Sequence, residues 1–368
     1  MKIPLVDLKA NYHSIKPEVD RAITEVLESG SYIMGPWVKA FEDQFASYTR
    51  VKHAIGCSNG TAALHLALLA CGVSKGDEVL TVPNTFIATT ECISYVGGVI
   101  RFVDVVPETG LLDVDFVEKA LTEKTKAIIV VDLYGQMPDM DKLSEIAEAH
   151  DVVLIEDAAQ AHGAEWNGRQ PGAYGRVACY SFFPAKNLGC YGDGGAVATN
   201  DAEIAQRLRM LSNHGRTKKY EHEIEGYNYR LDALQAAVLS VKLRHLSQWT
   251  EQRRSHARFY DEALPSSLER IHEARQAKHV YYMYVIRAVR RAELMALLAG
   301  QGIECGIHYP VPLHRQPAYA SYGWRQGQFP VAEQLAEEIV SIPMYPELTD
   351  EQQRFVVDRI SESVKKSV

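Results

Sequence analysis

From about residue 52 to residue 200 the chain alternates short apolar runs with segments of helical periodicity. The apolar runs lie at 53–57, 78–82, 99–103, 127–131 and 152–155. Strong helix formers fill segments between them, such as 62–69 and 141–147. Crossovers of this length join parallel strands. We therefore expect an α/β fold whose parallel sheet is flanked by helices on both faces.

The remainder of the chain has a different pattern. A polar stretch at 214–229 is typical of a surface loop, and a long helical pattern then runs from about 231 to 263, where Pro265 breaks it. An apolar run at 279–286, a helix at 291–298 and a last helix at 350–364 predict a small C-terminal α+β domain. With the boundary inside the long helix, we expect a large domain at 1–245 and a small domain at 246–368.

Composition narrows the class of protein. The 368 residues are 46% hydrophobic and 23% charged, which is typical of globular chains, and the net charge of -8 argues against a nucleic-acid partner. No apolar stretch approaches the length of a membrane span, and the N-terminus lacks a signal-peptide core, so we expect a cytoplasmic protein. The six cysteines show no metal-ligand spacing, and we expect reduced thiols and no metal site.

The first candidate for chemistry is Asp157, which follows Glu156 at the end of the apolar run 152–155. Ligands of open parallel sheets bind at the carboxyl ends of strands, so an acid there faces a crevice. The alternative is that Asp157 caps a helix or lies at a solvated strand end and has no catalytic role.

The second candidate is Lys186, which lies in a proline turn between apolar segments and precedes the glycine-rich stretch 189–195. Desolvation favours the neutral amine, which is the form that condenses with a carbonyl. A solvated surface lysine is the alternative.

The third candidate is the segment Ser58-Asn59-Gly60-Thr61, which opens a helix. Its unpaired N–H groups can hold a phosphate, although Asn59 or Thr61 can equally be a plain helix cap. No Walker A or dinucleotide glycine pattern is present.

Together these features match the needs of one cofactor. Pyridoxal phosphate requires a lysine for its aldehyde, an acid for its ring nitrogen, donors for its phosphate and a surface against its ring. Lys186, Asp157, the turn before Thr61 and the aromatic Phe86, which follows another strand end, supply this set.

Three motifs then carry a family resemblance. Residues 156–164 (EDAAQAHGA), 181–189 (SFFPAKNLG) and 226–230 (GYNYR) resemble the DegT/DnrJ/EryC1/StrS family of sugar aminotransferases. The resemblance extends from Gly30-Ser31-Tyr32-Ile33-Met34-Gly35-Pro36 to 308–314. It implies fold type I of the pyridoxal phosphate enzymes, with a large domain around a mostly parallel sheet and a small C-terminal domain.

The resemblance also implies residue roles. Lys186 would bond to the cofactor and move the proton between cofactor and substrate carbons, and Asp157 would pair with the ring nitrogen. The other cofactor contacts would come from the phosphate-binding residues Ser181, Thr61, Gly60 and Ala62, from Gln160 at the ring edge, from Phe86 on the ring face and from Asn228, which would reach the phosphate of a neighbouring subunit.

The last of these roles implies a homodimer with shared active sites, whose loop at 214–229 inserts into the partner. Members with lysine at this position transfer amino groups, so the resemblance implies transfer from an amino acid, most often glutamate, to a nucleotide-linked keto sugar. Residues 307–317 and Asn59-Gly60-Thr61 resemble members that act at C3 of the hexose more than members that act at C4.

The substrate contacts are open at this stage. Lys219 and Tyr220 are candidates for the nucleotide diphosphate, with a solvated loop as the alternative, and His308 either lines the sugar pocket or is a structural histidine. A cyclitol aminotransferase acting on a keto-inositol and a non-catalytic regulator that binds pyridoxal phosphate are the competing functions.

Overall fold

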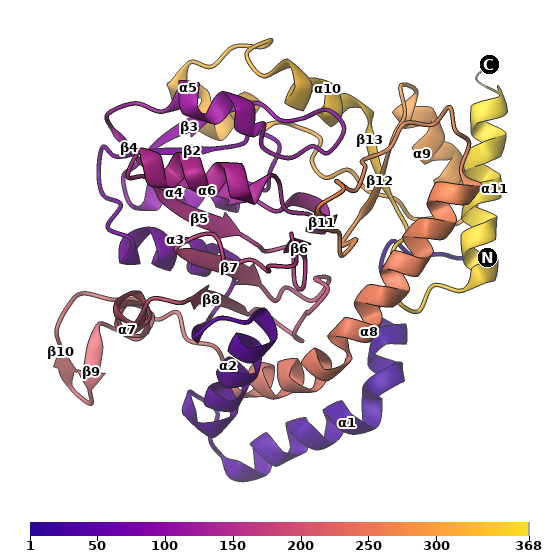
Figure 1. Ribbon diagram of the computed structural model, residues 1–368. Coiled ribbons are helices and arrows are strands. Elements are labelled where there is room, and N and C mark those ends of the chain that lie inside the picture. Colours follow the sequence, from indigo (N-terminus) through magenta and orange to yellow (C-terminus); the bar gives the residue numbers. More distant parts are fainter. Residues whose placement is uncertain (367–368) are drawn as a thin grey trace.

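The computed structural model describes residues 1–366 and contains a central seven-stranded sheet in the order β1-β8-β7-β5-β4-β2-β3 (Figure 1). Its strands are β1 (His53–Cys57), β2 (Glu78–Thr81), β3 (Val99–Phe102), β4 (Thr125–Val131), β5 (Val153–Asp157), β7 (Val177–Ser181) and β8 (Gly195–Thr199). The α/β class and the five strands expected from the apolar runs are confirmed.

The sheet is mostly, but not wholly, parallel. Strands β3, β2, β4, β5 and β7 pair in parallel, whereas β8 runs antiparallel to both β7 and β1. The mostly parallel sheet implied by the resemblance is therefore confirmed, and β8 is the strand that departs from the parallel direction. The reason is local, because β8 returns from β7 through the glycine-rich segment without a crossover helix. Gly195 lies so close to the turn before α3 that a Cβ there would be 2.5 Å from the carbonyl oxygen of Asn59.

Helices cover both faces of the sheet, as the alternation along β4 requires. Ala127 and Ile129 are buried with α3 (Gly60–Ala70), α4 (Ala88–Tyr95) and α7 (Ala202–Leu211) on one face. Ile128 and Val130 are buried with α2 (Gly35–Thr49) and α6 (Met140–Ala149) on the other. The strand side chains are shielded from water in both layers, which favours a parallel sheet.

The long helix α8 (Ala233–Ala263) runs from the part of the molecule that contains the central sheet to the C-terminal part (Figure 1). Its first half packs against α1 (Leu8–Ser29), where Val238 and Val241 meet Val19. Its second half contributes Ala257 and Tyr260 to a separate apolar core. The proposed domain boundary after residue 245 falls between these halves, and the division into two domains stays a prediction.

The main elements of the C-terminal part, as far as residue 366, are an antiparallel pair of strands and α-helices. They are β12 (Tyr284–Arg287), β13 (Ile339–Ile342), α9 (Arg291–Gly300), α10 (Pro330–Glu338) and α11 (Asp350–Lys366). Only the end of the apolar run 279–286 is a strand. Its first half is a connector that is hydrogen-bonded to the chain after β4. The N–H groups of Val280 and Tyr282 donate to the carbonyls of Gly135 and Tyr134, respectively, at 2.9 Å.

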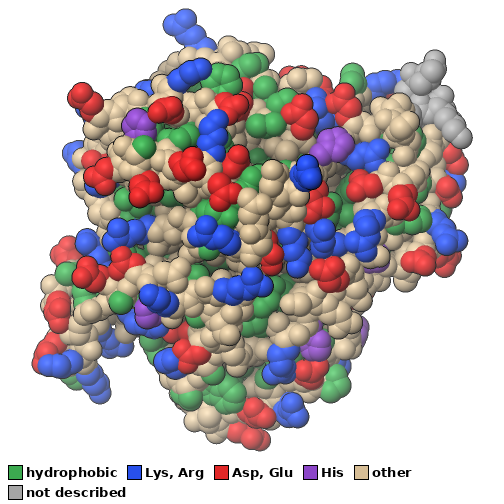
Figure 2. Space-filling view, viewed as in Figure 1, with side chains coloured by type: hydrophobic (Ala, Val, Ile, Leu, Met, Phe, Trp, Pro, Cys, Tyr) green, Lys and Arg blue, Asp and Glu red, His purple; other side chains and the backbone are tan. Residues whose placement is uncertain are grey.

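The polar stretch 214–229 is a surface loop as expected, and it holds a short hairpin of β9 (Arg216–Lys218) and β10 (Glu221–His222). The hairpin projects from the body of the molecule (Figure 1), and both basic and acidic side chains lie on it (Figure 2), among them Lys218 and Glu221, which form an ion pair. None of the helices in residues 1–366 has the length and apolar character needed to cross a membrane.

Candidate active site

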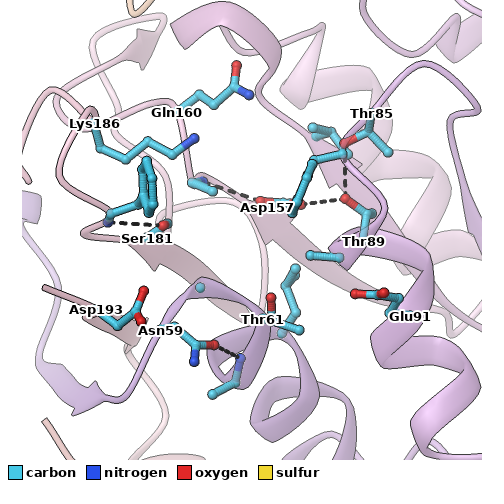
Figure 3. Close-up of a pocket in the computed structure, with 18 of the residues that line it drawn as sticks. Asn59, Thr61, Thr85, Thr89, Glu91, Asp157, Gln160, Ser181, Lys186 and Asp193 are labelled. Atoms are coloured by element: carbon cyan, nitrogen blue, oxygen red, sulfur yellow. Dashed lines mark hydrogen bonds between the residues drawn. The ribbon is translucent and has the colours of Figure 1, made fainter. Parts of the chain in front are cut away.

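A cavity of about 710 Å³ lies at the carboxyl edge of the sheet. Strands β5 and β7 end there in Asp157 and Ser181, and helix α3 begins there after β1. Nine of the residues proposed from the sequence line this cavity, namely Gly60, Thr61, Ala62, Phe86, Asp157, Gln160, Ser181, Lys186 and His308. Figure 3 shows Lys186, Asp157, Ser181 and Thr61 around one space. The crevice expected at the strand ends is therefore present.

Asp157 is a buried carboxylate held from two sides. The hydroxyl of Thr89 donates to its Oδ2 at 2.8 Å, and the N–H of Ala159 donates to its Oδ1 at 3.3 Å. Burial raises the pKa of Asp157, while the Thr89 and Ala159 hydrogen bonds and the charge of Lys186 oppose the rise. A cationic ring nitrogen in the cavity would complete the neutralisation of this carboxylate.

Lys186 lies in a tight turn directly after β7. Its N–H donates to the carbonyl of Phe183 at 2.8 Å, and Gly189 closes the turn so tightly that a Cβ there would lie 2.3 Å from the carbonyl oxygen of Pro184. The half-buried side chain reaches into the cavity, and its Nζ lies 4.3 Å from the ring centre of Tyr282. The turn thus presents one amine to a cavity that also contains Asp157.

The N-terminus of α3 provides a place for an anion. The side chain of Asn59 accepts from the N–H of Ala62 at 2.8 Å, and the earlier N–H groups of the helix face outward. Gly60 packs against β7 so closely that a Cβ would lie 2.7 Å from the Cβ of Ser181. This contact places the Thr61 and Ser181 hydroxyls beside the helix N-terminus, a donor set suited to phosphate.

A hydrogen-bonded chain connects the sheet edge to the C-terminal part. Gln160 accepts from the N–H of Tyr134 at 2.7 Å and donates to the Tyr309 hydroxyl at 3.3 Å. The Tyr134 hydroxyl donates to the carbonyl of His308 at 2.7 Å. Burial and the charge of Lys186 lower the pKa of His308 to about 4, so its imidazole is neutral at pH 7.

An aromatic pair stands at the cavity wall beside this chain. Phe86 and Tyr309 have ring centres 5.7 Å apart, and Phe86 is 52% exposed. Its exposed ring can stack on a flat ligand. A lysine, a buried acid, a helix N-terminus with hydroxyls and a free aromatic face together fit pyridoxal phosphate.

Three of the proposed residues lie outside this cavity. Asn228 is exposed and pairs through its backbone with Asn213, and Lys219 and Tyr220 lie at the tip of the projecting hairpin. Tyr220 is 80% exposed. Within one copy of the chain these side chains do not reach the site.

Several cavity residues were not found from the sequence. Thr89, Tyr282 and Tyr309 contact Asp157, Lys186 and Gln160, respectively. Tyr309 follows the candidate His308, which is a usable signal. Thr89 and Tyr282 carry no such signal in the sequence, because Thr89 is an ordinary helix residue and Tyr282 lies in an apolar run typical of a buried strand. In residues 1–366 no group of His, Cys, Asp and Glu side chains is arranged to hold a metal ion.

Known proteins match nearly the whole chain. The sequence model of the DegT/DnrJ/EryC1/StrS aminotransferase family matches residues 13–361. A pleiotropic regulatory protein of Geobacillus stearothermophilus is 50% identical over 98% of both chains. A dTDP-3-amino-3,4,6-trideoxy-alpha-D-glucose transaminase of Streptomyces venezuelae is 44% identical over 98% of this chain and 96% of its own length.

The fold is matched as closely. The crystal structure of S. venezuelae DesV in complex with a ketimine intermediate superposes with a TM-score of 0.97, at 43% identity over 99% of both chains. Solved structures of other aminotransferases with this fold hold pyridoxal phosphate or pyridoxamine phosphate. Pyridoxal phosphate is therefore the cofactor of this protein, and the aminotransferase fold expected from the motifs is confirmed.

We predict that Asp157→Asn makes the cofactor-free protein more stable at pH 8 while weakening its affinity for pyridoxal phosphate. Folding raises the pKa of Asp157, so the carboxyl costs stability once the pH rises above its ordinary value, and the cost is complete above its folded value. The melting temperature at pH 8 should increase by about 2 °C or more, and the gain should shrink as the pH approaches 4.

The matched control is Asp193→Asn, because Asp193 is an exposed acid of the same cavity. It should leave the melting temperature unchanged. A lower melting temperature for Asp157→Asn at pH 8 would contradict the account of Asp157.

Proposed function

The chain belongs to the DegT/DnrJ/EryC1/StrS aminotransferase family, and on this premise we propose that it moves an amino group from an amino acid to a nucleotide-linked keto sugar. The observation that supports this most is the meeting of Lys186 and Asp157 in one cavity beside the N-terminus of α3. When bound, pyridoxal phosphate supplies an aldehyde for amines and an electron-withdrawing ring.

The proposed roles of the residues follow from their positions. Lys186 would supply the amine that bonds to the cofactor aldehyde and, as a free amine, the base that carries a proton between the reacting carbon atoms. Asp157 keeps the ring nitrogen protonated, because a charge on that nitrogen pairs with the carboxylate. Phe86 covers the ring face, and Gln160 fixes the ring edge.

The phosphate is held by the backbone at Gly60 and by the hydroxyls of Thr61 and Ser181. The N–H of Ala62, which was also proposed from the sequence, donates to the side chain of Asn59 at 2.8 Å. Asn59 contributes by capping α3, which keeps the first N–H groups directed at the cavity. These groups bind a dianion without a metal ligand.

Charge supports a shared site in a homodimer. The cavity wall contains three acids, Glu91, Asp157 and Asp193, and within residues 1–366 its only lysine or arginine is Lys186. Both substrates are anions, so further cations have to reach the site. The exposed hairpin carries Lys219 and Tyr220 at its tip, and we propose that this loop, with Asn228 behind it, inserts into the cavity of a second copy.

In this arrangement Lys219 and Tyr220 contact the nucleotide diphosphate and Asn228 contacts the cofactor phosphate of the partner. His308 lines the wall of the sugar pocket, where its neutral imidazole donates or accepts a hydrogen bond. The cytoplasmic location expected from the sequence stays a prediction.

We propose glutamate as the donor and C3 of the hexose as the position aminated. The S. venezuelae relative supports C3, because its name places the amino group there. C4 and a keto-inositol acceptor remain as alternatives of the same chemistry. The G. stearothermophilus relative, named as a regulator, keeps open a second role in regulation. The complete set of Lys186, Asp157 and phosphate donors favours turnover.

We predict that Lys186→Ala abolishes amino transfer, because within residues 1–366 of one copy no other lysine lines the cavity, and the partner's Lys219 is proposed to contact the nucleotide diphosphate and not the cofactor aldehyde. Turnover with glutamate and the keto sugar should decrease by about 10³-fold or more. The phosphate donors and Asp157 are untouched, so the variant should still bind pyridoxal phosphate, as measured by quenching of intrinsic fluorescence. Turnover near the wild-type rate would refute the role of Lys186.

We predict that the wild-type protein aminates a nucleotide-linked 3-keto hexose faster than its 4-keto isomer. The measurement compares kcat/KM for the two sugars and for keto-inositol, with glutamate as donor and the amino products identified by mass spectrometry. Activity on keto-inositol alone would rule out the nucleotide-sugar proposal, and a preference for the 4-keto isomer would rule out C3.

A further inference from the structure

Two cations on α8, Lys242 and Arg253, are buried behind the turn that carries Lys186. Their exposed fractions are 3% and 4%, and within residues 1–366 neither has a carboxylate oxygen at ion-pair distance. Burial lowers the pKa of Lys242 to about 8 and that of Arg253 to about 10, and the charge of Glu347 opposes both shifts. Buried cations without an ion pair cost stability, so their presence calls for another explanation.

Lys242 binds the turn itself. Its Nζ donates to the carbonyl of Gly189 at 2.7 Å and lies 4.5 Å from the ring centre of Tyr191. Gly189 is the residue that closes the Lys186 turn, so the Lys242 ammonium fixes the far end of that turn to α8. A cation makes a stronger hydrogen bond to a carbonyl than a neutral donor does.

Arg253 binds the segment that carries Tyr282. Its Nη1 donates to the carbonyl of Met344 at 2.7 Å and to that of Tyr281 at 3.4 Å. Tyr281 has a φ of 45°, a left-handed conformation that is unfavourable for an aromatic residue. The guanidinium therefore holds a strained backbone in place, directly before Tyr282.

The two segments meet above Lys186. The side chain of Asn187 donates to the carbonyl of Val280 at 3.0 Å and so ties the turn to the Tyr282 segment. The ring of Tyr282 then lies 4.3 Å from Lys186 Nζ. Lys242 holds the Lys186 turn, and Arg253 holds the Tyr282 segment. The contact between the turn and the segment sets where the Lys186 amine can point.

We propose that Lys242 and Arg253 are positioning residues, which keep the Lys186 amine and the Tyr282 ring in register for bond formation with the cofactor. The proposal rests on the role of Lys186 in the proposed function. It explains why α8 keeps two buried charges, because each binds a carbonyl of a segment that shapes the position of one amine.

The test uses the full chain, freed of cofactor and recombined with pyridoxal phosphate, and measures the rate of covalent attachment to Lys186 by stopped-flow absorbance. Lys242→Met removes the cation and keeps an unbranched side chain that is one atom shorter. We expect attachment to slow by about ten- to a hundredfold, since a misplaced reacting group costs that much. The melting temperature should stay equal or increase, because a buried unpaired charge is lost.

Thr250→Val is the matched control. Thr250 lies on α8 between the two cations, is 3% exposed, and its hydroxyl has no hydrogen-bond partner in the described part of the chain. This variant should attach the cofactor at the wild-type rate. A merely structural role of Lys242 predicts the opposite of our expectation, namely a lower melting temperature with a wild-type attachment rate, and this result would overturn the proposal.

Arg253→Lys tests the same proposal if the Lys242→Met variant does not fold. It keeps the charge but shortens the side chain by one atom, so it weakens the contacts that Nη1 of Arg253 makes to the carbonyls of Tyr281 and Met344. Slow attachment supports the proposal, and the wild-type rate overturns it. If the wild-type protein attaches pyridoxal phosphate to Lys186 but transfers no amino group, the proposed function alone is refuted. If the wild-type protein does not attach the cofactor, both the proposed function and the positioning role are overturned.

Discussion

The burial of a carboxylate at the end of β5 is the constraint on which the site depends. Strand β5 lies inside the sheet, between β4 and β7, so Asp157 is removed from water when the layers close. Burial raises its pKa, and the donors that oppose this rise come from the helix after β2 and from the chain after β5 itself. The positive charge of Lys186 arrives on the turn after β7. The order of the strands in the sheet thus brings together Asp157, its hydrogen-bond donors and the Lys186 amine.

The cavity joins two halves that perform different tasks. The sheet edge supplies the acid, the lysine and the anion site, all fixed by strands and by the start of α3. The C-terminal part supplies His308, Tyr309 and Tyr282, which are tied to the sheet through Gln160 and Tyr134. The first set suits a cofactor that stays in place. Helix α8 connects both parts, because its two halves pack in different apolar clusters.

The sequence predicted the parts of the site that lie at ends of regular elements. Asp157 and Lys186 follow apolar strands, and Thr61 opens a helix, so each has a place set by the periodicity of its neighbours. The connector around Tyr282 was missed because its residues resemble a buried strand, and only the hydrogen bonds to Tyr134 and Gly135 reveal a different path. Thr89 was missed because a contact to Asp157 across 68 positions leaves no local pattern. The antiparallel β8 was missed for a related reason, since pairing direction depends on whether a helix intervenes.

Under the proposed function, Lys186 and Asp157 hold pyridoxal phosphate in a form that accepts an amino group from glutamate. The most direct test is the absorbance spectrum of the purified protein with pyridoxal phosphate, before and after glutamate is added without any keto acceptor. We predict a visible band of lysine-bound cofactor that disappears on addition of glutamate, with growth of the shorter-wavelength band of pyridoxamine phosphate. A spectrum of free cofactor that glutamate leaves unchanged would contradict the account.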